Sequence, residues 1–583
     1  MFACRRCWLG LVLIAACCTS SAATARAAEP RTILDAIPKE AGFALVVGDP
    51  RLLIRTILEL RAVQDASALP AVREALDGTA TRRAFQFLKF LERETGEQWP
   101  TLLNKVAGNG VALSIGYGPG GKTDATLLVL KGQDEAAVAK VFDLLVRAVE
   151  EERSRQGVTE PLKRANHGGA DGVEIDKEFL VARLGDTLFA SNKSKSLQAA
   201  IDLANRKAGC ESLNTLASIA EAKHLLPKNP LGWFWLDLTM LKSTKESKDF
   251  FEATRKDLFQ TLLFGTTADC VRRADFVAGA LAREKEGVRF AVRLPAGRDG
   301  FPPEFALHAP PQGKPGSLAL LEPPGVLYSQ SFYLDLATLW SQRDKLINAE
   351  VRKQFEKGEK DLAKVLPGLK IGEILNASGA YHRFVVVNLD KIPYTREPGQ
   401  KLPGFGYAAS MRDPTFGKSV EALIRGGGFL VSLSQGIKLI EQTHEGVKLF
   451  GYRFPEDREL ADDEANIRFN FEPTFAIVDD QFIAGSTIEV AKKLVTEVRR
   501  TAKSSSTPQL WRAKAYAAAG AEALAAAPEA TITDTMLRQA ITLAEAKQQV
   551  EQLGDYLRTL GTFEMDLDEP ATRWNFDLMW RFK

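Results

Sequence analysis

The stretch VARLGDTLFASNKSKSLQAAIDLA, Val181 to Ala204, has a counterpart much later in the chain, FAIVDDQFIAGSTIEVAKKLVTEV, Phe475 to Val498. In each copy two short apolar runs flank a turn, Gly185-Asp186 in the first and Asp479-Asp480 in the second. Short turns between apolar runs are typical of antiparallel strand pairs. A helical pattern follows in both copies. The two stretches therefore predict the same element twice, a β-hairpin that leads into a helix.

Other stretches match in the same order along the chain. TLLNKVAGNGVALSI, from Thr101, parallels EILNASGAYHRFVVV, from Glu373. The stretch DAIPKEAGFALVVGDPRLL, from Asp35, has a looser counterpart that begins at Ala319. Each half also closes with an alternating strand, which is the pattern of a half-buried strand. These matches predict that the whole chain is an internal duplication.

One ungapped match sets the register of this duplication towards the end of each half. Residues 235–266 lie over residues 531–562, so that Gly265-Thr266 falls on Gly561-Thr562. In this interpretation the Ala-rich stretch 509–526 is one long helix.

The predicted fold class is α+β, with two tandem duplicated domains, each an antiparallel sheet with helices packed on one face. A chain of 583 residues is too long for one hydrophobic core, which supports at least two domains. We expect the first repeat domain at 29–295 and the second at 317–583, joined by a Gly- and Pro-rich linker at 296–316.

Residues 1–28 have the pattern of an export signal. Arg5 and Arg6 precede the apolar run Trp8 to Ala16, and Ala25-Arg26-Ala27 is typical of a cleavage site. A second interpretation starts from Ile14-Ala15-Ala16-Cys17, which resembles a bacterial lipobox and would make Cys17 a lipidated residue. The sequence therefore predicts an extracytoplasmic protein, periplasmic or secreted, that is either soluble or anchored by lipid. No later segment is predicted to be a transmembrane helix.

Charge bears on the class of partner, and cysteine content bears on disulfide bonding. The 76 basic and 74 acidic residues nearly balance, which gives no reason to expect nucleic acid as a partner. Four of the six cysteines lie in residues 1–28, which leaves Cys210 and Cys270. An oxidising compartment permits a disulfide between them, and two buried free thiols are the other interpretation.

The stretch SIGYGPGGKTDATLLVLK, from Ser114, contains Gly116, Gly121, Lys122 and Thr123 at the spacing of a phosphate-binding loop. Such a loop needs a helix that starts at the Lys-Thr pair, so that backbone N–H groups converge on phosphate. Here an apolar, β-branched run follows instead. The duplicate half replaces the glycine segment with an unrelated loop. We therefore interpret these residues as the turn of a β-hairpin.

No other pattern in the sequence predicts a catalytic residue, a cofactor site or a metal site. The five histidines lack the spacing of metal ligands, and no Gly-x-Ser-x-Gly motif is present. The acidic stretch Glu456 to Asn466 lacks the residue order of a calcium loop. The sequence thus favours no enzymatic activity, although it leaves the question open.

Three stretches carry a resemblance to known sequences: IPKEAGFALVVGDPRLL from Ile37, LGDTLFASN from Leu184, and ARAAEP from Ala25. They resemble uncharacterised exported proteins of planctomycete-like bacteria, which form a domain of unknown function. The resemblance implies an exported location and a fold of repeated strand and helix units. It carries no catalytic motif.

The leading functional hypothesis is a non-enzymatic binding or scaffold protein of the cell envelope, whose partner is an envelope protein, glycan or lipid. Repeats without a catalytic motif enlarge a surface more readily than they build one active site. A second hypothesis is an extracytoplasmic hydrolase with a dispersed site between the repeats, where Asp186, Asp479 and Asp480 are the carboxylates to test. A third is a periplasmic lipid carrier.

Overall fold

The structure, a computed structural model, describes residues 32–582 apart from residues 119–121, 177–178, 243–247, 250–257, 366–367, 390, 392, 460–462, 464 and 505. Internal contacts divide the chain into two units. The first comprises residues up to 248 and residues 274–295, and the second comprises residues 249–273 and 296–583. The expected export signal, with Cys17, lies outside the described residues.

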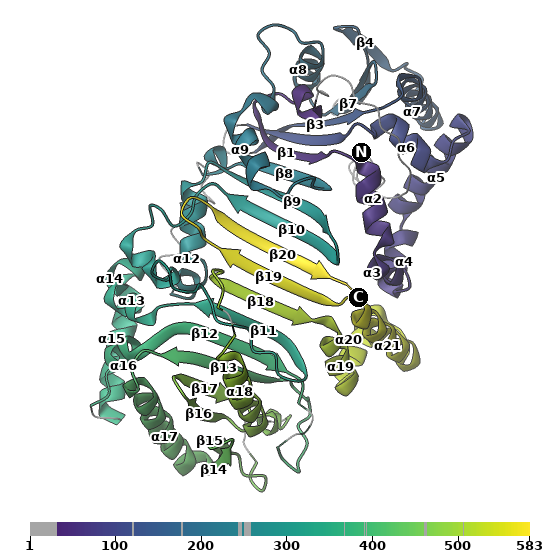
Figure 1. Cartoon of the computed structure of the whole chain (residues 1–583). Helices are drawn as coiled ribbons and strands as arrows, with labels where there is room; N and C mark the ends of the chain where they lie inside the picture. The colour runs from purple at the N-terminus through teal and green to yellow at the C-terminus, as the bar shows by residue number, and fades with distance from the viewer. Residues whose placement is uncertain are drawn as a thin grey trace. The chain divides into compact units, whose positions relative to one another are not determined.

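The first unit is built on an antiparallel sheet (Figure 1). Across the sheet the strands follow the order β10-β9-β8-β1-β2-β3-β7-β6-β5-β4, and each neighbouring pair is antiparallel. The strands are β1 (Ala41–Val47), β2 (Val111–Tyr117), β3 (Thr123–Lys131), β4 (Lys163–His167), β5 (Ala170–Asp176), β6 (Phe179–Leu184), β7 (Thr187–Ser191), β8 (Gly232–Asp237), β9 (Phe276–Glu284) and β10 (Gly287–Leu294).

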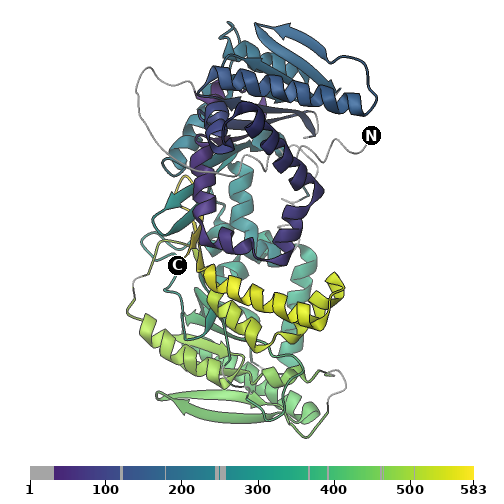
Figure 2. The same ribbon diagram turned by 90° about the vertical axis from the view of Figure 1, so that its right-hand side faces the viewer.

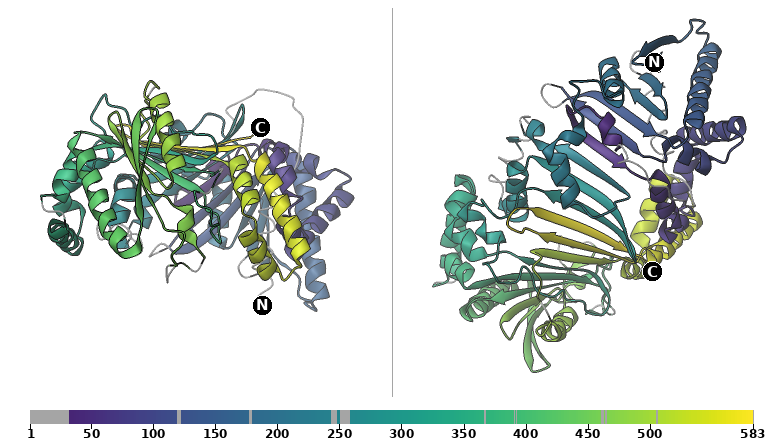
Figure 3. Two further views of the ribbon diagram at one scale, coloured as in Figure 1. Left: turned by 90° about the horizontal axis from the view of Figure 1, so that it is seen from below. Right: turned by 45° about the horizontal axis from the view of Figure 1, so that its top comes forward.

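The second unit has a sheet with the same strand order, in which β11 takes the place of β1, β12 that of β2, and so on to β20. Figure 3 shows its strands from two further directions. They are β11 (Val326–Tyr333), β12 (Ser378–Val387), β13 (Gly404–Met411), β14 (Lys438–His444), β15 (Val447–Arg453), β16 (Thr474–Val478), β17 (Gln481–Gly485), β18 (Trp511–Tyr516), β19 (Thr562–Asp568) and β20 (Trp574–Arg581).

Helices fill the longer connections between these strands, so the α+β class and the antiparallel sheets are confirmed. In the first unit, α2 to α6 follow one another as separate helices between β1 and β2 (Figure 2). The helical segments of this unit are η1 (Ile33–Ala36), α2 (Pro50–Glu59), α3 (Arg61–Ala66), α4 (Pro70–Asp77), α5 (Thr79–Thr95), α6 (Trp99–Ala107), α7 (Glu135–Arg155), α8 (Ser194–Ala204), η3 (Leu213–Thr215), α9 (Ala217–Leu225) and α10 (Leu238–Leu241).

In the second unit, the corresponding connection between β11 and β12 is also helical, and α20 and α21 pack side by side (Figure 2). Its helical segments are α12 (Leu258–Arg273), η4 (Pro303–His308), α13 (Leu336–Ser341), α14 (Arg343–Leu346), α15 (Ala349–Val365), α16 (Ile371–Ala377), α17 (Thr415–Gln435), η5 (Ile467–Asn470), α18 (Ile488–Thr501), α19 (Ala517–Ala526), α20 (Glu529–Gln539) and α21 (Leu543–Thr559). The shared strand order is an observation, whereas descent from a duplicated gene stays a prediction.

Helices cover both faces of each sheet near β7 and β17, and not one face as expected. In β7, Phe189 packs with Ile201 of α8, whereas Leu188 and Ala190 pack with Phe142 of α7. Successive strand residues point to opposite faces, so α7 and α8 lie on opposite faces of the sheet. The unbroken apolar run of this strand is the pattern of a strand buried on both sides.

The same arrangement recurs in the second unit. Ile483 of β17 packs against α18, and its neighbour Phe482 places its ring edge-on to Phe416 of α17, with 6.0 Å between the ring centroids. At β17 the sheet is therefore covered by α17 on one face and by α18 on the other.

The ungapped match between residues 235–266 and 531–562 is wrong. β8, at Gly232–Asp237, pairs with β1 in the way that β18, at Trp511–Tyr516, pairs with β11. The Ala-rich stretch 509–526 is therefore a strand followed by a helix, because its first residues alternate in a sheet before the alanines begin. Gly265 lies inside α12, whereas Gly561 precedes β19.

The expected linker, 296–316, is part of the second unit. It contains η4, whose side chains Phe305 and Leu307 are buried in a cluster with Leu339 and Ile347. The segment is therefore packed at η4, whereas residues 311–314, with Pro311 and Gly313, are exposed.

A buried carboxyl group lies beside this segment. Glu569 follows β19 and is 3% exposed. Burial raises the pKa of its carboxyl group to about 7, against the lowering effects of Thr266 and Arg298. The carboxyl group is therefore held in its neutral form more strongly in the folded chain than in the unfolded chain.

We expect Glu569→Gln to remove a pH dependence of stability. Because the folded pKa is raised, ionisation of Glu569 lowers the free energy of unfolding of the wild type as pH rises from about 4.5 to about 7, by about 3 kcal/mol in total. As pH rises over this interval, the free energy of unfolding of Glu569→Gln should therefore increase relative to that of the wild type. Denaturant unfolding at about pH 5 and about pH 8 measures it, with the exposed Glu529→Gln as control. An equal difference between wild type and Glu569→Gln at both pH values would contradict the buried neutral carboxyl.

Candidate functional site

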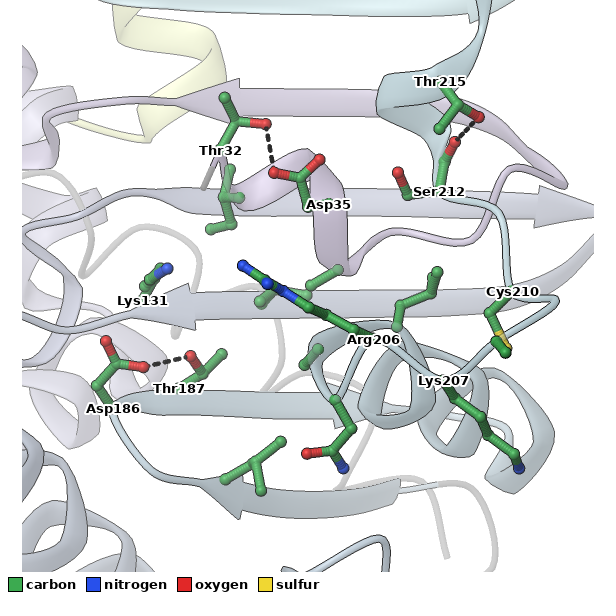
Figure 4. A pocket seen from close by; sticks show the side chains of 18 of the residues that line it. Thr32, Asp35, Lys131, Asp186, Thr187, Arg206, Lys207, Cys210, Ser212 and Thr215 are labelled. Atoms are coloured by element: carbon green, nitrogen blue, oxygen red, sulfur yellow. Dashed lines mark hydrogen bonds between the residues drawn. The ribbon is translucent and has the colours of Figure 1, made fainter. Parts of the chain in front are cut away.

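A pocket of about 640 Å3 opens in the first unit (Figure 4). This volume is within the range of small-molecule sites. Its walls come from η1, the end of β3, the β6–β7 turn and the segment that follows α8. The lining residues are Thr32, Ile33, Asp35, Ala36, Val129, Lys131, Leu184, Asp186, Thr187, Leu203, Ala204, Asn205, Arg206, Lys207, Ala208, Gly209, Cys210, Ser212 and Thr215.

The β6–β7 turn brings Asp186 to the pocket. Gly185 adopts a φ of 55° there, a conformation that glycine reaches without strain. The carbonyl of Asp186 accepts a hydrogen bond from the Gly132 amide at 2.8 Å, which fixes the turn beside the end of β3. The carboxylate of Asp186 accepts a hydrogen bond from Thr187 Oγ1 at 2.8 Å.

A second carboxylate, that of Asp35, comes from η1. It accepts hydrogen bonds from Asn214 Nδ2 at 2.9 Å and from Thr32 Oγ1 at 3.3 Å. Both pocket carboxylates are thus bonded to neutral donors. Neither forms an ion pair among the described residues.

Two cations line the pocket without such partners. Lys131 ends β3, and Arg206 lies just beyond α8; within the described residues neither side chain has a hydrogen-bond or ion-pair partner. Figure 4 shows the Arg206 side chain extended across the pocket towards Lys131. Lys207, by contrast, is paired with Asp202 at 2.9 Å. Arg206 and Lys131 are therefore available to a ligand.

The corresponding place in the second unit is filled by Arg383, which is only 2% exposed. Its Nη1 donates to Thr501 Oγ1 at 2.8 Å and to the Ala319 carbonyl at 3.3 Å, and its Nη2 donates to Gln481. Counted from the β6–β7 and β16–β17 turns, Gln481 corresponds to Thr187, which lines the pocket. The same count pairs Thr501 with Lys207, but Thr501 lies inside α18, whereas Lys207 lies beyond the end of α8. One partner of Arg383, Gln481, thus has its counterpart in the pocket wall.

The strand pairing identifies the counterpart of Arg383. In the second unit Arg383 of β12 is opposite Ala408 of β13, which is opposite Ile483 of β17. In the first unit Ala112 of β2 is opposite Val129 of β3, which is opposite Phe189 of β7. Ile483 and Phe189 are equivalent, because each is the same number of residues after its hairpin turn. An alanine therefore stands in the first unit where a buried arginine stands in the second. Ala112 is itself buried and does not line the pocket, whereas its strand partner Val129 does.

The other residues singled out by sequence lie elsewhere. Asp479 and Asp480 form the β16–β17 turn of the second unit, where Asp479 has a φ of 52°. Lys122 precedes β3, and Thr123 begins that strand, which runs antiparallel to β2. Gly116 lies in β2, and Gly121 is outside the described residues. The next helix, α7, begins only at Glu135.

Two further observations concern chemistry and membrane spanning. In the described part of the chain, no three His, Cys, Asp or Glu side chains gather in a way that suits a metal ion. None of the helices described is both long enough and apolar enough to span a bilayer.

Comparison with known proteins finds no matching family model and no matching curated protein. Among solved structures the chain is similar to crystal forms I and III of TP0453, with TM-scores of 0.23 and 0.22 and sequence identities of 9% and 10%. Each alignment covers 47% of this chain, and 82% and 83% of the other chain. A likeness at this level carries no argument, so the site stands on its own geometry.

The two cysteines beyond the expected signal are free thiols in different environments. Cys210 is exposed at the pocket, and Cys270 is buried in α12. Burial raises the pKa of the Cys270 thiol well above its usual value, which suppresses the reactive thiolate.

We expect a thiol reagent to modify Cys210 alone in the folded protein from residue 29 onward. Ellman's reagent should titrate one thiol quickly and the second only after denaturation, because the buried thiol is neither accessible nor ionised. Cys210→Ser should abolish the fast phase, and Cys270→Ser should leave it unchanged. Absence of any free thiol would instead indicate a disulfide.

Proposed function

We propose that the chain is an exported binding protein of the cell envelope and that the pocket of the first unit holds a small polar ligand. The observation that carries this proposal is a pocket of about 640 Å3 whose cations, Lys131 and Arg206, are left without protein partners. Arg206 is exposed and Lys131 is half-buried, so water can reach both cations in the empty pocket. Polar groups that converge in a concave site without protein partners are typical of ligand recognition.

The chemistry of the lining supports binding more than catalysis. The pocket has hydroxyl groups, from Thr187, Ser212 and Thr215 among others, but no histidine lines it. Asp186 and Asp35 already accept hydrogen bonds from neutral donors. Two hydroxyl groups of the pocket donate directly to carboxylates, Thr187 to Asp186 and Thr32 to Asp35, and no described histidine of the pocket stands between a hydroxyl and its carboxylate as in a Ser–His–Asp triad.

The mixed polar lining also favours a small polar ligand over an acyl chain. Of the side chains that line the pocket, the charged and hydroxyl-bearing ones are interspersed with a few apolar ones such as Ile33 and Val129. A lipid carrier would need a mainly apolar cavity. The hydrolase hypothesis stays a prediction, with Asp186 as its carboxylate in this pocket.

A variant that narrows the pocket tests the proposal. Ala208 lines the pocket and is exposed, so Ala208→Trp should place an indole there without disturbing the core. In a saturation-transfer NMR screen of small polar fragments, we expect hits with the wild type and a loss of at least about tenfold in affinity with Ala208→Trp.

The matched control is Ala80→Trp, an exposed alanine of α5 that does not line the pocket. This control should retain every hit. Fragments that bind all three proteins equally, or a wild type that binds none, would contradict a ligand site in this pocket.

A further inference from the structure

We infer that the ligand of the first unit carries a carboxylate, held by Arg206 together with Lys131. This inference rests on the proposed function, because it assumes that the pocket binds a small molecule. It is argued from a second difference between the two units, separate from the exchange of Arg383 for Ala112.

The second unit shows how the counterpart of Arg206 is held. Counted from the two turns, Leu203 corresponds to Glu497, and both lie inside their helices. The same count pairs Arg206 with Arg500 in sequence, although α8 ends at Ala204 whereas α18 continues to Thr501. Arg500 donates to Glu497 through Nε at 3.0 Å and through Nη2 at 2.7 Å, which is a two-point contact with one carboxylate. The side chain of Glu497 is 7% exposed, so Arg500 is matched to a buried carboxylate.

In the first unit that carboxylate is missing. Leu203 stands at the position of Glu497 and lines the pocket. The Arg206 guanidinium therefore has the planar donor geometry that binds carboxylate, and no protein carboxylate to receive it. A ligand carboxylate would supply the group that the protein supplies itself in the second unit.

The end of α8 fixes the backbone of Arg206. Arg206 has a φ of 56° because it is the residue that ends the helix: its amide donates to the Leu203 carbonyl at 2.9 Å, and the Lys207 amide donates to the Asp202 carbonyl at 3.0 Å. Glycine is the usual residue in this conformation, so arginine is strained there. This helix end carries the side chain that extends across the pocket (Figure 4).

The remaining polar groups indicate what else the ligand bears. Asp186 and Asp35 line the same pocket as acceptors. A carboxylate of Asp binds hydroxyl or amino groups well, and repels a second anion. The structure therefore favours a small carboxylic acid that carries a single anionic end together with hydroxyl or amino groups, over a polyanion.

Calorimetry with matched acid and amide probes tests this inference. Gluconate and succinate, each compared with its neutral amide at constant ionic strength, vary the charge and keep the size. We expect gluconate to bind most tightly and its amide at least about tenfold more weakly. Bound gluconate should also slow modification of Cys210, which lines the same pocket.

Variants of the two cations complete this test. Arg206→Gln and Lys131→Met should each weaken gluconate by about tenfold or more, whereas Arg82→Ala, an exposed arginine of α5 outside the pocket, should not. Equal binding of acid and amide, tighter binding of inorganic phosphate than of gluconate, unchanged binding by Arg206→Gln, or no binding of either acid would overturn the inference.

Arg206→Gly separates a binding role from a structural one. Glycine relieves the strained φ, so this variant should lose gluconate binding and yet unfold at a higher temperature than the wild type. Ala540→Gly, which relieves a φ of 51° outside the pocket, should raise the unfolding temperature and keep binding. An Arg206→Gly protein that is less stable than the wild type would assign Arg206 to the fold, against the inference.

The fragment screen and these titrations fail in different ways. Neutral fragments that bind the wild type and not Ala208→Trp, with no preference for acids, would leave the proposed function standing and overturn the carboxylate. A wild type that binds neither fragments nor acids would overturn both.

Discussion

The buried guanidinium of Arg383 ties the sheet of the second unit to the helix α18. It crosses from β12 to the C-terminal end of α18 and is held by Thr501, Gln481 and the carbonyl of Ala319. Burial lowers its pKa to about 10, and the charges of Asp480 and Glu497 oppose that shift. Such a charge is costly to bury unless its donors are satisfied; Nη1 and Nη2 have partners, whereas the buried Nε has none among the described residues. In the first unit an alanine, Ala112, stands at the same place in the matching strand order.

The two units share one strand order but differ in the side chains that line the sheet. The second unit matches an internal arginine and an internal glutamate to its own side chains, whereas the first has Ala112 and Leu203 in their places. The first unit thus lacks the buried arginine and the buried glutamate, and it contains the pocket that Leu203 and Arg206 line. Two units with the same strand order can therefore differ in their sites, because function depends on side chains grafted on the fold.

Much of the fold was accessible from sequence. The hairpin and helix of residues 181–204 and 475–498 were predicted with the register that the structure shows, because Gly185 and Asp479 both occupy the left-handed turn position. The strand after Thr123 was likewise predicted from its apolar, β-branched run. Local patterns of this kind depend on neighbours in the chain, which a sequence displays directly.

What the sequence did not reveal depends on contacts between distant residues. The alanines of 517–526 extend a helical pattern back over residues 511–516, which form a strand. Helix propensity cannot indicate that Trp511 pairs with Phe332 of another strand. Lys131 and Arg206 carry no motif, and only their convergence in space distinguishes them from solvated cations. The sequence match that begins at Thr101 and Glu373 sets Arg383 against Val111. Only the strand pairing shows that Ala112 is the counterpart of Arg383.

The central claim is that the Arg383 guanidinium fills in the second unit the space that is open in the first. The direct measurement is the unfolding temperature of Arg383→Ala with and without millimolar guanidinium, at constant ionic strength. The account predicts a loss of several degrees, which added guanidinium partly restores in the variant and not in the wild type, because the free ion can occupy the vacated site. A variant as stable as the wild type, or one that guanidinium does not restore, would contradict it.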